Sequence, residues 1–295
     1  MSKSILITGS SSGFGKLIAE TLAKDGHTVF ASMRNVNGKN AETASALSDW
    51  SKKKGLSLNV VELDVTEDAS INKAIQYIIS ANGKIDVVIN NAGILSVGLN
   101  ETLSTENVKH LFDVNVFGAF RVTKAALPFM RKQGSGLFIH ISSINGRSIV
   151  PFTGVYCATK YALEALAESF RYDLATQGID SVIVEPGAFP TEMGSNIIPG
   201  DEADILLEYG EMQQYLKQFT TGFEALFSGP NIPNPQDVAD AVKKLIDTPT
   251  GQRPLRTVVD QNKEGIEAIN TVSREVQNQL LEIFGMKKLL TPKGQ

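Results

Sequence analysis

Two side chains that could carry out proton transfer, Tyr156 and Lys160, stand four positions apart. Residues at this spacing lie on one face of a helix, so the Tyr156 phenol and the Lys160 ammonium would be neighbours. A free phenol has a pKa near ~10 and is a poor acid or base at neutral pH. Because a nearby cation stabilises the phenolate, we expect the pKa of Tyr156 to lie below its ordinary value. The same pair is also common on exposed helices, so its meaning depends on the surrounding elements.

The composition is that of a globular protein: 42% of the 295 residues are hydrophobic, 20% are charged, and the net charge is −4. The one basic run, Lys52–Lys54, stands at the end of an expected helix, which predicts a solvated face and no nucleic-acid partner. A single cysteine, Cys157, permits no intrachain disulfide and favours a reducing compartment. The first eight residues contain too short an apolar run for a signal peptide or a membrane span. We therefore expect a cytoplasmic protein without a membrane partner.

A glycine-rich segment follows the first expected strand, Ser4–Thr8, and contains Gly9, Gly13 and Gly15. An apolar helical pattern begins behind it and ends near Gly26. In this strand, turn and helix context, glycines let the backbone approach a phosphate, and the helix N-terminus offers free N–H groups and a partial positive charge. The alternative is a tight turn that serves packing alone.

The second expected strand, His27–Met33, ends at Arg34 and not at an acidic residue. An acid in this position binds the free ribose hydroxyls of NAD(H), whereas an arginine accommodates the additional phosphate of NADP(H). Charge-assisted hydrogen bonds of about 1.5–3 kcal/mol correspond to a preference of roughly 10- to 150-fold. We expect NADP(H), with NAD(H) as the alternative; an arginine that points into water is the other interpretation.

Strands and helices alternate along the chain. Further strands are expected over Leu56–Leu63, Ile85–Ile89, Leu137–Ile141, Asp180–Glu185 and Leu255–Val259. Helices are expected over Asn40–Lys54, Thr66–Asn82, Thr105–Lys132, Pro151–Gln177, Val238–Ile246 and from Ile266 to Ile283. This alternation predicts an α/β fold, a doubly wound parallel sheet of the Rossmann type with helices on both faces. Ligands of such sheets bind outside the carboxyl ends of the strands, where Gly9, Arg34, Asp64 and Asn91 are expected.

Several motifs occur in a fixed order: Thr8-Gly9-x-x-x-Gly13-x-Gly15, Asn90-Asn91-Ala92-Gly93, Asn115, Ser143, Tyr156-x-x-x-Lys160 and Pro186-Gly187-x-x-x-Thr191. In these motifs the chain resembles the short-chain dehydrogenase/reductase family, over roughly Lys3 to Asp247.

The resemblance implies four catalytic residues. Tyr156 would be the acid in carbonyl reduction and the base in alcohol oxidation, and Lys160 would lower its pKa and hold the nicotinamide ribose. Ser143, thirteen positions before Tyr156, would bind the substrate oxygen. Asn115 would position a water that links Lys160 to solvent.

The resemblance also implies a cofactor site. Asp64 and Val65 would contact the adenine, Asn91 the adenosine ribose, and Thr191 the nicotinamide carboxamide. Ser12 departs from the pattern, because many NADP-using relatives have a basic residue there. The full set of implied cofactor-binding residues is Gly9, Ser11, Ser12, Gly13, Phe14, Gly15, Arg34, Asp64, Val65, Asn91, Ala92, Gly93, Tyr156, Lys160, Pro186, Gly187 and Thr191.

The segment from about 188 to 234 is expected to form a lid over the substrate. Its apolar residues are Phe189, Met193, Ile197, Ile198, Leu206, Leu207, Tyr215, Phe219, Phe223 and Phe227. Further apolar residues are expected around the pocket: Leu95, Val97, Ile144, Val150 and Phe152. With no Arg or Lys placed to bind an anionic substrate, the pattern favours a lipophilic carbonyl or alcohol; alternatively, the lid residues pack against one another.

We expect a single domain over residues 1–295 with a C-terminal helical extension over about 261–295. The apolar stripe of that extension must be covered by the body of the protein or by another subunit; it comprises Ile266, Ile269, Val272, Val276, Leu280 and Ile283. The family resemblance implies a homodimer or homotetramer built through the helices that carry Asn115 and Tyr156. The three histidines lack metal-ligand spacing, so no metal site is expected.

These patterns favour an NAD(P)(H)-dependent oxidoreductase that interconverts a carbonyl and an alcohol by hydride transfer, with Tyr156 as acid or base. The alternative is a catalytically silent dinucleotide-binding sensor of the same fold, although such relatives usually lack the Tyr/Lys pair. A structural or partner-binding role for the C-terminal helix is a third possibility. Steroid- or retinoid-like alcohols, acyl-thioester ketones and simple aliphatic ketones remain equally open.

Overall fold

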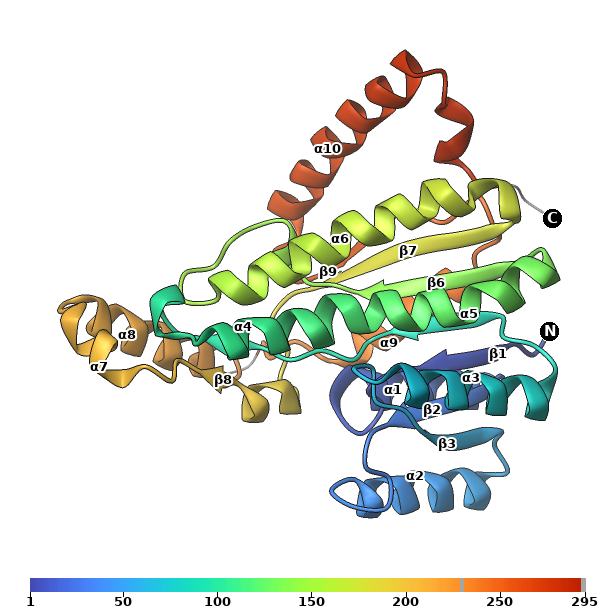
Figure 1. The fold of residues 1–295 in the computed structure, drawn as a ribbon, viewed down its shortest axis with the longest axis horizontal. Coiled ribbons are helices and arrows are strands. Elements are labelled where there is room, and N and C mark those ends of the chain that lie inside the picture. The colour runs from blue at the N-terminus through green and yellow to red at the C-terminus, as the bar shows by residue number, and fades with distance from the viewer. Residues whose placement is uncertain (229–230, 293–295) are drawn as a thin grey trace.

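A seven-stranded parallel sheet with the order β3-β2-β1-β4-β6-β7-β9 forms the centre of the protein (Figure 1). The computed structural model describes residues 1–228 and 231–292, so residues 229–230 of the expected lid and 293–295 of the expected extension lie outside it. The strands are β1 Ser4–Ile7, β2 Thr28–Met33, β3 Leu58–Glu62, β4 Val87–Asn90, β6 Gly136–Ile141, β7 Ile179–Pro186 and β9 Arg256–Val259. The expected α/β fold is confirmed, and the strand order reverses between β1 and β4, where ligands bind to such sheets.

Helices cover both faces of the sheet. One face carries α1 Gly13–Lys24, α2 Ala41–Lys54 and α9 Gln236–Asp247. The other carries α3 Asp68–Asn82, α4 Thr105–Phe112, α5 Ala119–Gln133 and α6 Gly154–Leu174 (Figure 1). Buried aliphatic side chains, such as Leu22 and Val242 on the first face and Ile75 and Val122 on the second, form the two cores. Burial on both faces explains why the strands read as continuous apolar runs.

The helical segment expected over Thr105–Lys132 is present from Thr105 to Gln133 and contains a π-helical turn, Asp113–Gly118, which includes Asn115. Two other expected helix boundaries are wrong, each for a local reason. The helix expected from Thr66 begins at Asp68, because the Asp64 carboxylate accepts hydrogen bonds from the Thr66 N–H and hydroxyl and closes a turn there.

The second boundary concerns the helix that carries Tyr156 and Lys160. Pro151 does not open α6, which begins at Gly154. Phe152 has a φ of 66°, so a right-handed helix cannot run through it. The turn before α6 is therefore a separate structure, held in part by the Thr153 hydroxyl, which donates to the Val150 carbonyl at 2.8 Å.

The lid lies beyond the carboxyl ends of the strands (Figure 1). It contains α7 Ala203–Glu208 and α8 Met212–Ala225, and a short strand, β8 Ile198–Pro199, that pairs with β5 Ser96–Val97. This pairing attaches the lid to the loop after β4. The lid helices therefore stand over the end of the sheet where a cofactor and a substrate would meet.

The C-terminal helix α10, Glu264–Ile283, projects from the body at a steep angle to α6 (Figure 1). Ile266 in its apolar stripe is buried at 7% exposure. The other stripe residues are 40% to 77% exposed: Ile269, Val272, Val276, Leu280 and Ile283. The described body of the protein thus does not cover most of the stripe. Among the described residues, no helix combines the length and apolar character needed to cross a lipid bilayer.

Candidate active site

Two adjoining cavities lie at the carboxyl ends of the strands. The first has a volume of about 560 Å³ and the second about 520 Å³. They share four lining residues, Phe14, Asn91, Thr191 and Met193. Most of the expected cofactor-binding residues line the first cavity: Gly9, Ser11, Ser12, Gly13, Phe14, Arg34, Asp64, Val65, Asn91, Ala92, Gly93 and Thr191. Tyr156, Lys160, Pro186 and Gly187 line the second cavity together with Ser143.

The glycines of the first loop are required by close backbone contacts. Gly9 has a φ of +68°, and a Cβ there would stand 2.9 Å from the Ala92 Cα. A Cβ on Gly15 would stand 2.2 Å from the Gly9 carbonyl oxygen, so Gly15 lies behind the loop and not in the cavity wall. These contacts bring the N-terminus of α1 to the cavity with its N–H groups directed outward. The loop therefore fits the pyrophosphate of a dinucleotide.

The outer end of the first cavity carries two cations. Arg34 and Lys39 both line it, and Asn40 Nδ2 donates to the Arg34 carbonyl at 2.6 Å. The Glu62 carboxylate accepts the backbone N–H of Asn35 at 2.7 Å and so holds the loop after β2. Lys39 was not anticipated from sequence, because it lies five residues past Arg34 in a loop of undefined shape. The sequence signal for Lys39 is that it is a second basic residue in the loop after β2.

Tyr156 and Lys160 occupy the first two turns of α6 and are 6% and 3% exposed. The Lys160 ammonium donates to the Ile141 carbonyl at 2.9 Å and lies 5.6 Å from the centre of the Tyr156 ring. Burial lowers the pKa of Lys160 to about 8, against the charge of Glu164, which raises it.

The pKa of Tyr156 is shifted in the direction opposite to the one expected. Burial raises the pKa of Tyr156 to about 12, although its hydrogen bond with Ser143 acts to lower it. The phenolate is penalised by removal from water more than it is stabilised by its neighbours. In this structure the phenol is therefore a protonated acid at neutral pH. The expectation of a lowered pKa is wrong for the protein without its cofactor.

Ser143 and Asn115 are both held by the backbone around the site. The Ser143 hydroxyl donates to the Pro186 carbonyl at 3.4 Å, which connects β6 to the end of β7. The Asn115 amide accepts from the Ile94 N–H at 2.8 Å and donates to the Ile94 carbonyl at 2.9 Å and the Thr159 hydroxyl at 3.0 Å. Asn115 thus connects the π-helical turn, the loop after β4 and α6. Its expected role in holding a water remains a prediction.

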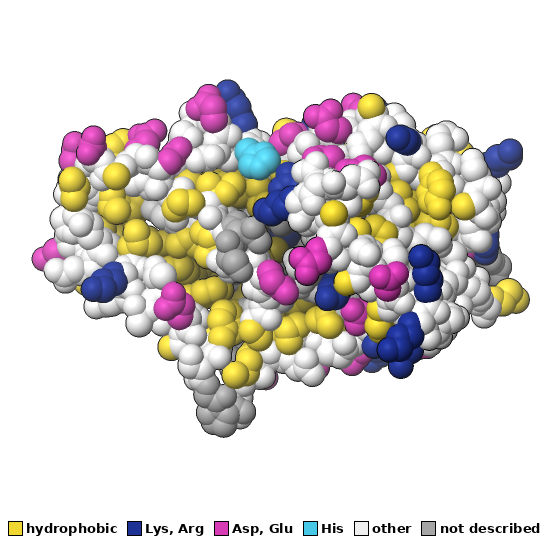
Figure 2. Space-filling view, turned by 90° about the horizontal axis from the view of Figure 1, so that it is seen from below, with side chains coloured by type: hydrophobic (Ala, Val, Ile, Leu, Met, Phe, Trp, Pro, Cys, Tyr) yellow, Lys and Arg dark blue, Asp and Glu magenta, His cyan; other side chains and the backbone are white. Residues whose placement is uncertain are grey.

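The second cavity is mainly apolar. From the body it is lined by the expected Leu95, Val97, Ile144 and Val150, and from the lid by Phe189, Met193, Phe219, Phe223, Leu226 and Phe227. The rings of Phe219 and Phe223 lie 6.1 Å apart and those of Phe223 and Phe227 5.2 Å apart. In Figure 2 hydrophobic side chains gather in the hollow at the lid end, and charged side chains lie mostly on its rim. Within the described part of the chain, Lys160 is the one basic side chain that lines this cavity.

Some expected pocket residues lie elsewhere. Phe152 does not line the cavity but packs against Phe219 at a ring distance of 5.6 Å. Ile197 and Ile198 line the first cavity, not the second. Three other lid residues, Leu206, Leu207 and Tyr215, line neither cavity.

A buried charge cluster under α6 was missed by the sequence analysis. Arg256 donates to Glu164 at 2.7 Å, and Asn270 of α10 donates to Glu185 at 2.6 Å. Burial and the charge of Glu164 raise the pKa of Glu185 to about 7. The cluster joins β7, β9 and α10 to α6, the helix that carries Tyr156 and Lys160. The sequence signal for this cluster is Glu164, an acidic residue that stands one helical turn after Lys160.

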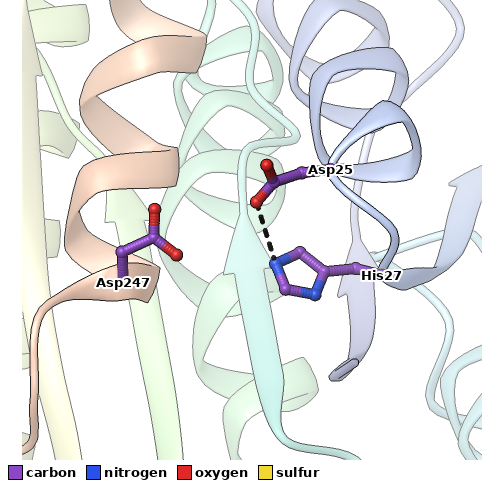
Figure 3. Close-up of side chains that lie close together, drawn as sticks. All are labelled: Asp25, His27 and Asp247. Carbon is purple, nitrogen blue, oxygen red and sulfur yellow. Dashed lines mark ion pairs between the residues drawn. The ribbon is translucent and has the colours of Figure 1, made fainter. Parts of the chain in front are cut away.

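Asp25, His27 and Asp247 lie close together at the amino ends of the strands (Figure 3), and none of them lines either cavity. The His27 Nδ1 accepts the Lys3 N–H at 3.3 Å, so Nε2 carries the proton and faces Asp25 at 3.6 Å. Lys243 lies 3.1 Å from Asp25 and 2.7 Å from Asp247. A metal would need a lone pair on Nε2 and a proton on Nδ1. The arrangement fits a network of ion pairs better than a metal centre.

The fold and the two cavities together define a dinucleotide-binding α/β protein of the Rossmann type. The sequence profile of the short chain dehydrogenase family matches residues 3–202. Human retinol dehydrogenase 8 is 33% identical over 281 residues, which cover 92% of this chain and 85% of that protein. The chain therefore belongs to the short-chain dehydrogenase family of oxidoreductases.

Solved structures agree with this assignment. A short-chain dehydrogenase from Streptomyces avermitilis has a TM-score of 0.73 and 30% identity, with 97% of each chain covered. An alcohol dehydrogenase from the archaeon Thermococcus sibiricus, in complex with 5-hydroxy-NADP, has a TM-score of 0.69 and 26% identity. The similarity to the second structure covers 88% of this chain and 96% of that chain.

Proposed function

We propose that the protein is an NADP(H)-preferring oxidoreductase that interconverts a carbonyl and an alcohol on a lipophilic small molecule. One observation carries the proposal: Tyr156 and Ser143 face an apolar cavity that adjoins the dinucleotide-shaped cavity. A substrate in the second cavity and a nicotinamide between the two would place the reacting groups beside a phenol and a hydroxyl. This is the arrangement that hydride transfer with proton transfer requires.

The bound nicotinamide cofactor would supply or accept the hydride. The Tyr156 hydroxyl donates its proton to the carbonyl oxygen in reduction and takes it back in oxidation. The Ser143 hydroxyl holds the same oxygen by a hydrogen bond. The Lys160 ammonium, 5.6 Å from the Tyr156 ring, stabilises negative charge on the phenol oxygen as the proton leaves. Because burial raises the pKa of Tyr156 to about 12, the phenol carries at neutral pH the proton that carbonyl reduction needs.

Two features support NADP(H) over NAD(H). Arg34 and Lys39 both line the outer end of the first cavity, and either guanidinium or ammonium can bind a ribose phosphate. The archaeal relative was solved with 5-hydroxy-NADP. NAD(H) remains the alternative, because Ser12 adds no third cation.

The lipophilic substrate class rests on the aromatic wall of the second cavity. Phe219, Phe223 and Phe227 stand one helical turn apart on α8 or just beyond it and line the cavity together. Retinol dehydrogenase 8, named for an apolar alcohol, supports the same class. A ring system or a long apolar chain next to the reacting carbonyl would bury these side chains.

We also infer a cytoplasmic homo-oligomer with no nucleic-acid or membrane partner. The single cysteine, Cys157, is a buried thiol, as suits a reducing compartment. Phe117, Phe120 and Tyr161 are 39% to 50% exposed on the segments that carry Asn115 and Tyr156. Such a surface is suited to a second copy of the chain.

The test is NADPH consumption with ketones and aldehydes graded in size and polarity, measured for the wild type and for Tyr156→Phe. We expect turnover that increases with apolar character. The variant should lose roughly 10²- to 10⁴-fold in activity and still bind NADPH, because the ring remains. Tight cofactor binding without turnover of any carbonyl, or of any alcohol in reverse, would instead favour the dinucleotide-binding sensor.

A further inference from the structure

An acidic side chain of the lid lies at the N-terminus of α1. The Glu192 carboxylate accepts a hydrogen bond from the Gly13 N–H at 2.9 Å. Gly13 is the first residue of α1, and Glu192 directly follows Thr191, 179 positions later in the chain. Both residues line the first cavity. The contact therefore lies inside the site that fits a dinucleotide and joins the glycine loop to the start of the lid.

The position of this carboxylate is the one that an anionic ligand would occupy. The N-terminus of α1 offers free N–H donors and the positive end of the helix dipole. The N-cap residue, Ser12, makes no side-chain capping hydrogen bond, and the first turn contains no acidic residue. A carboxylate that arrives from the lid thus supplies the negative charge that this helix end lacks.

A carboxylate and a pyrophosphate cannot share these donors without cost. Both are anions, and like charges held close together in a partly enclosed site repel each other. A cofactor that places its pyrophosphate at the glycine loop must therefore displace Glu192 from the Gly13 N–H or work against its charge.

We propose that Glu192 is an internal anion that holds the pyrophosphate position in the free protein, lowers the affinity for the cofactor, and moves away when the cofactor binds. The proposal rests on the dinucleotide site of the proposed function and adds a residue that tunes it. Because the flanking residues Thr191 and Met193 line both cavities, this movement also changes the wall of the substrate cavity. Cofactor binding and the shape of the substrate site are thereby coupled.

The experiment compares dissociation constants for NADPH, measured by its fluorescence, in the wild type, Glu192→Gln and Glu192→Ala. Both variants remove the competing charge, so we expect the Kd for NADPH to fall about 2- to 30-fold, the range for one charge at a helix terminus. Glu202→Gln is the matched control. It makes the same change of charge at an exposed lid residue that lines neither cavity, and its Kd should equal that of the wild type.

A second ligand separates the pyrophosphate position from the rest of the site. Adenosine 2′-monophosphate has the base and the ribose phosphate but no pyrophosphate, so its Kd should be the same in the wild type and in Glu192→Gln. An NADPH affinity in Glu192→Gln that is unchanged or weaker would overturn the proposal, as would an equal gain for both ligands. If neither NADPH nor NADH binds to the wild type or any variant, the proposed function itself fails, and this inference fails with it.

Discussion

The pKa values of Tyr156 and Lys160 depend more on burial than on the neighbours that these residues have in the sequence. Tyr156 and Lys160 stand at the expected helical spacing, yet burial raises the pKa of the first to about 12 and lowers that of the second to about 8. Both shifts favour the neutral forms of the two groups. We expect a bound cofactor that gives the Lys160 ammonium polar partners to change this balance.

Glu185 provides a prediction for the dependence of stability on pH. Burial raises its pKa in the folded protein to about 7 from an ordinary value of 4.5. Between these values the folded state keeps a proton that the unfolded state has lost, so the contribution of Glu185 to the free energy of unfolding falls as the pH rises. Glu185→Gln removes this dependence and can still accept the Asn270 hydrogen bond. In urea unfolding at pH 5, 6, 7 and 8, the variant should gain stability relative to the wild type as the pH rises.

The control for this measurement is Glu275→Gln, which makes the same change at an exposed position of α10. Its pH dependence should match that of the wild type. If Glu185→Gln also gave a curve parallel to that of the wild type, the raised pKa of Glu185 would be wrong.

We expect individual side chains to set the proposed cofactor preference as well. Arg34→Ala and Lys39→Ala should each raise the Kd for NADPH about tenfold, equivalent to the loss of roughly 1.4 kcal/mol, and leave the Kd for NADH unchanged. The reason is that each side chain contributes charge-assisted hydrogen bonds to the additional phosphate. Lys73→Ala, which removes an exposed cation from α3, is the control. Equal losses of affinity for NADPH and NADH would show that Arg34 and Lys39 do not recognise the additional phosphate of NADPH.

At the scale of elements, the lid helix α8 leaves its apolar face incompletely buried. None of its described residues is fully buried, although Phe219 and Phe223 line the second cavity. An amphipathic helix normally buries such a face against the body of its protein. Here a cavity of about 520 Å³ is lined by this face on one side and by Ser143 and Tyr156 on the other. The substrate is therefore expected to supply part of the core of the lid.

Phe223→Ala tests this interpretation of α8. Burial of a phenylalanine side chain contributes about 1.5–3 kcal/mol, so KM for an apolar carbonyl should rise roughly 10- to 150-fold. KM for a small polar carbonyl should change little, because such a substrate does not reach the aromatic wall. Tyr215→Ala on the same helix lies outside both cavities and is the control. Equal effects of Phe223→Ala on both substrates would contradict an apolar site at α8.

At the scale of the whole molecule, two groups of exposed apolar side chains outside the lid bear on assembly, among the residues that the structure describes. One lies on the segments that carry Asn115 and Tyr156 and includes Phe117, Phe120 and Tyr161. The other is the stripe of α10, which projects from the body (Figure 1). α10 is also attached to the interior through Asn270 and Glu185. The first turns of α10 are thus attached to the body of the protein, whereas its apolar stripe stays exposed and could contact another molecule.

Light scattering distinguishes the two surfaces. Phe120→Glu places a charge in the first surface, which is costly to bury, and should shift the protein from a dimer or tetramer to a smaller species at equal concentration. Val276→Glu places the same charge on α10 and should leave the assembly intact. The reverse result would make α10 the contact between subunits. A wild type that is monomeric at all concentrations would reject the homo-oligomer.

The sequence by itself determined those features that depend on local spacing. The alternation of apolar strands and helices defines the sheet class. The spacing of Gly9, Gly13 and Gly15 predicts a phosphate-binding loop, and the four-residue step predicts that Tyr156 and Lys160 are neighbours on one helix. These patterns are local because helix and strand periodicity, and the backbone freedom of glycine, act over a few residues.

Only the tertiary structure decided the features that join distant parts of the chain. The strand order and the place of Lys39 at the first cavity depend on loop paths that no local pattern encodes. The same is true of Phe223, which lines the second cavity, and of Phe152, which packs outside it against Phe219. The contact of Glu192 with Gly13 spans 179 positions. The direction of the Tyr156 pKa shift also belongs here, because burial is a property of the assembled core and not of the helix that carries the residue.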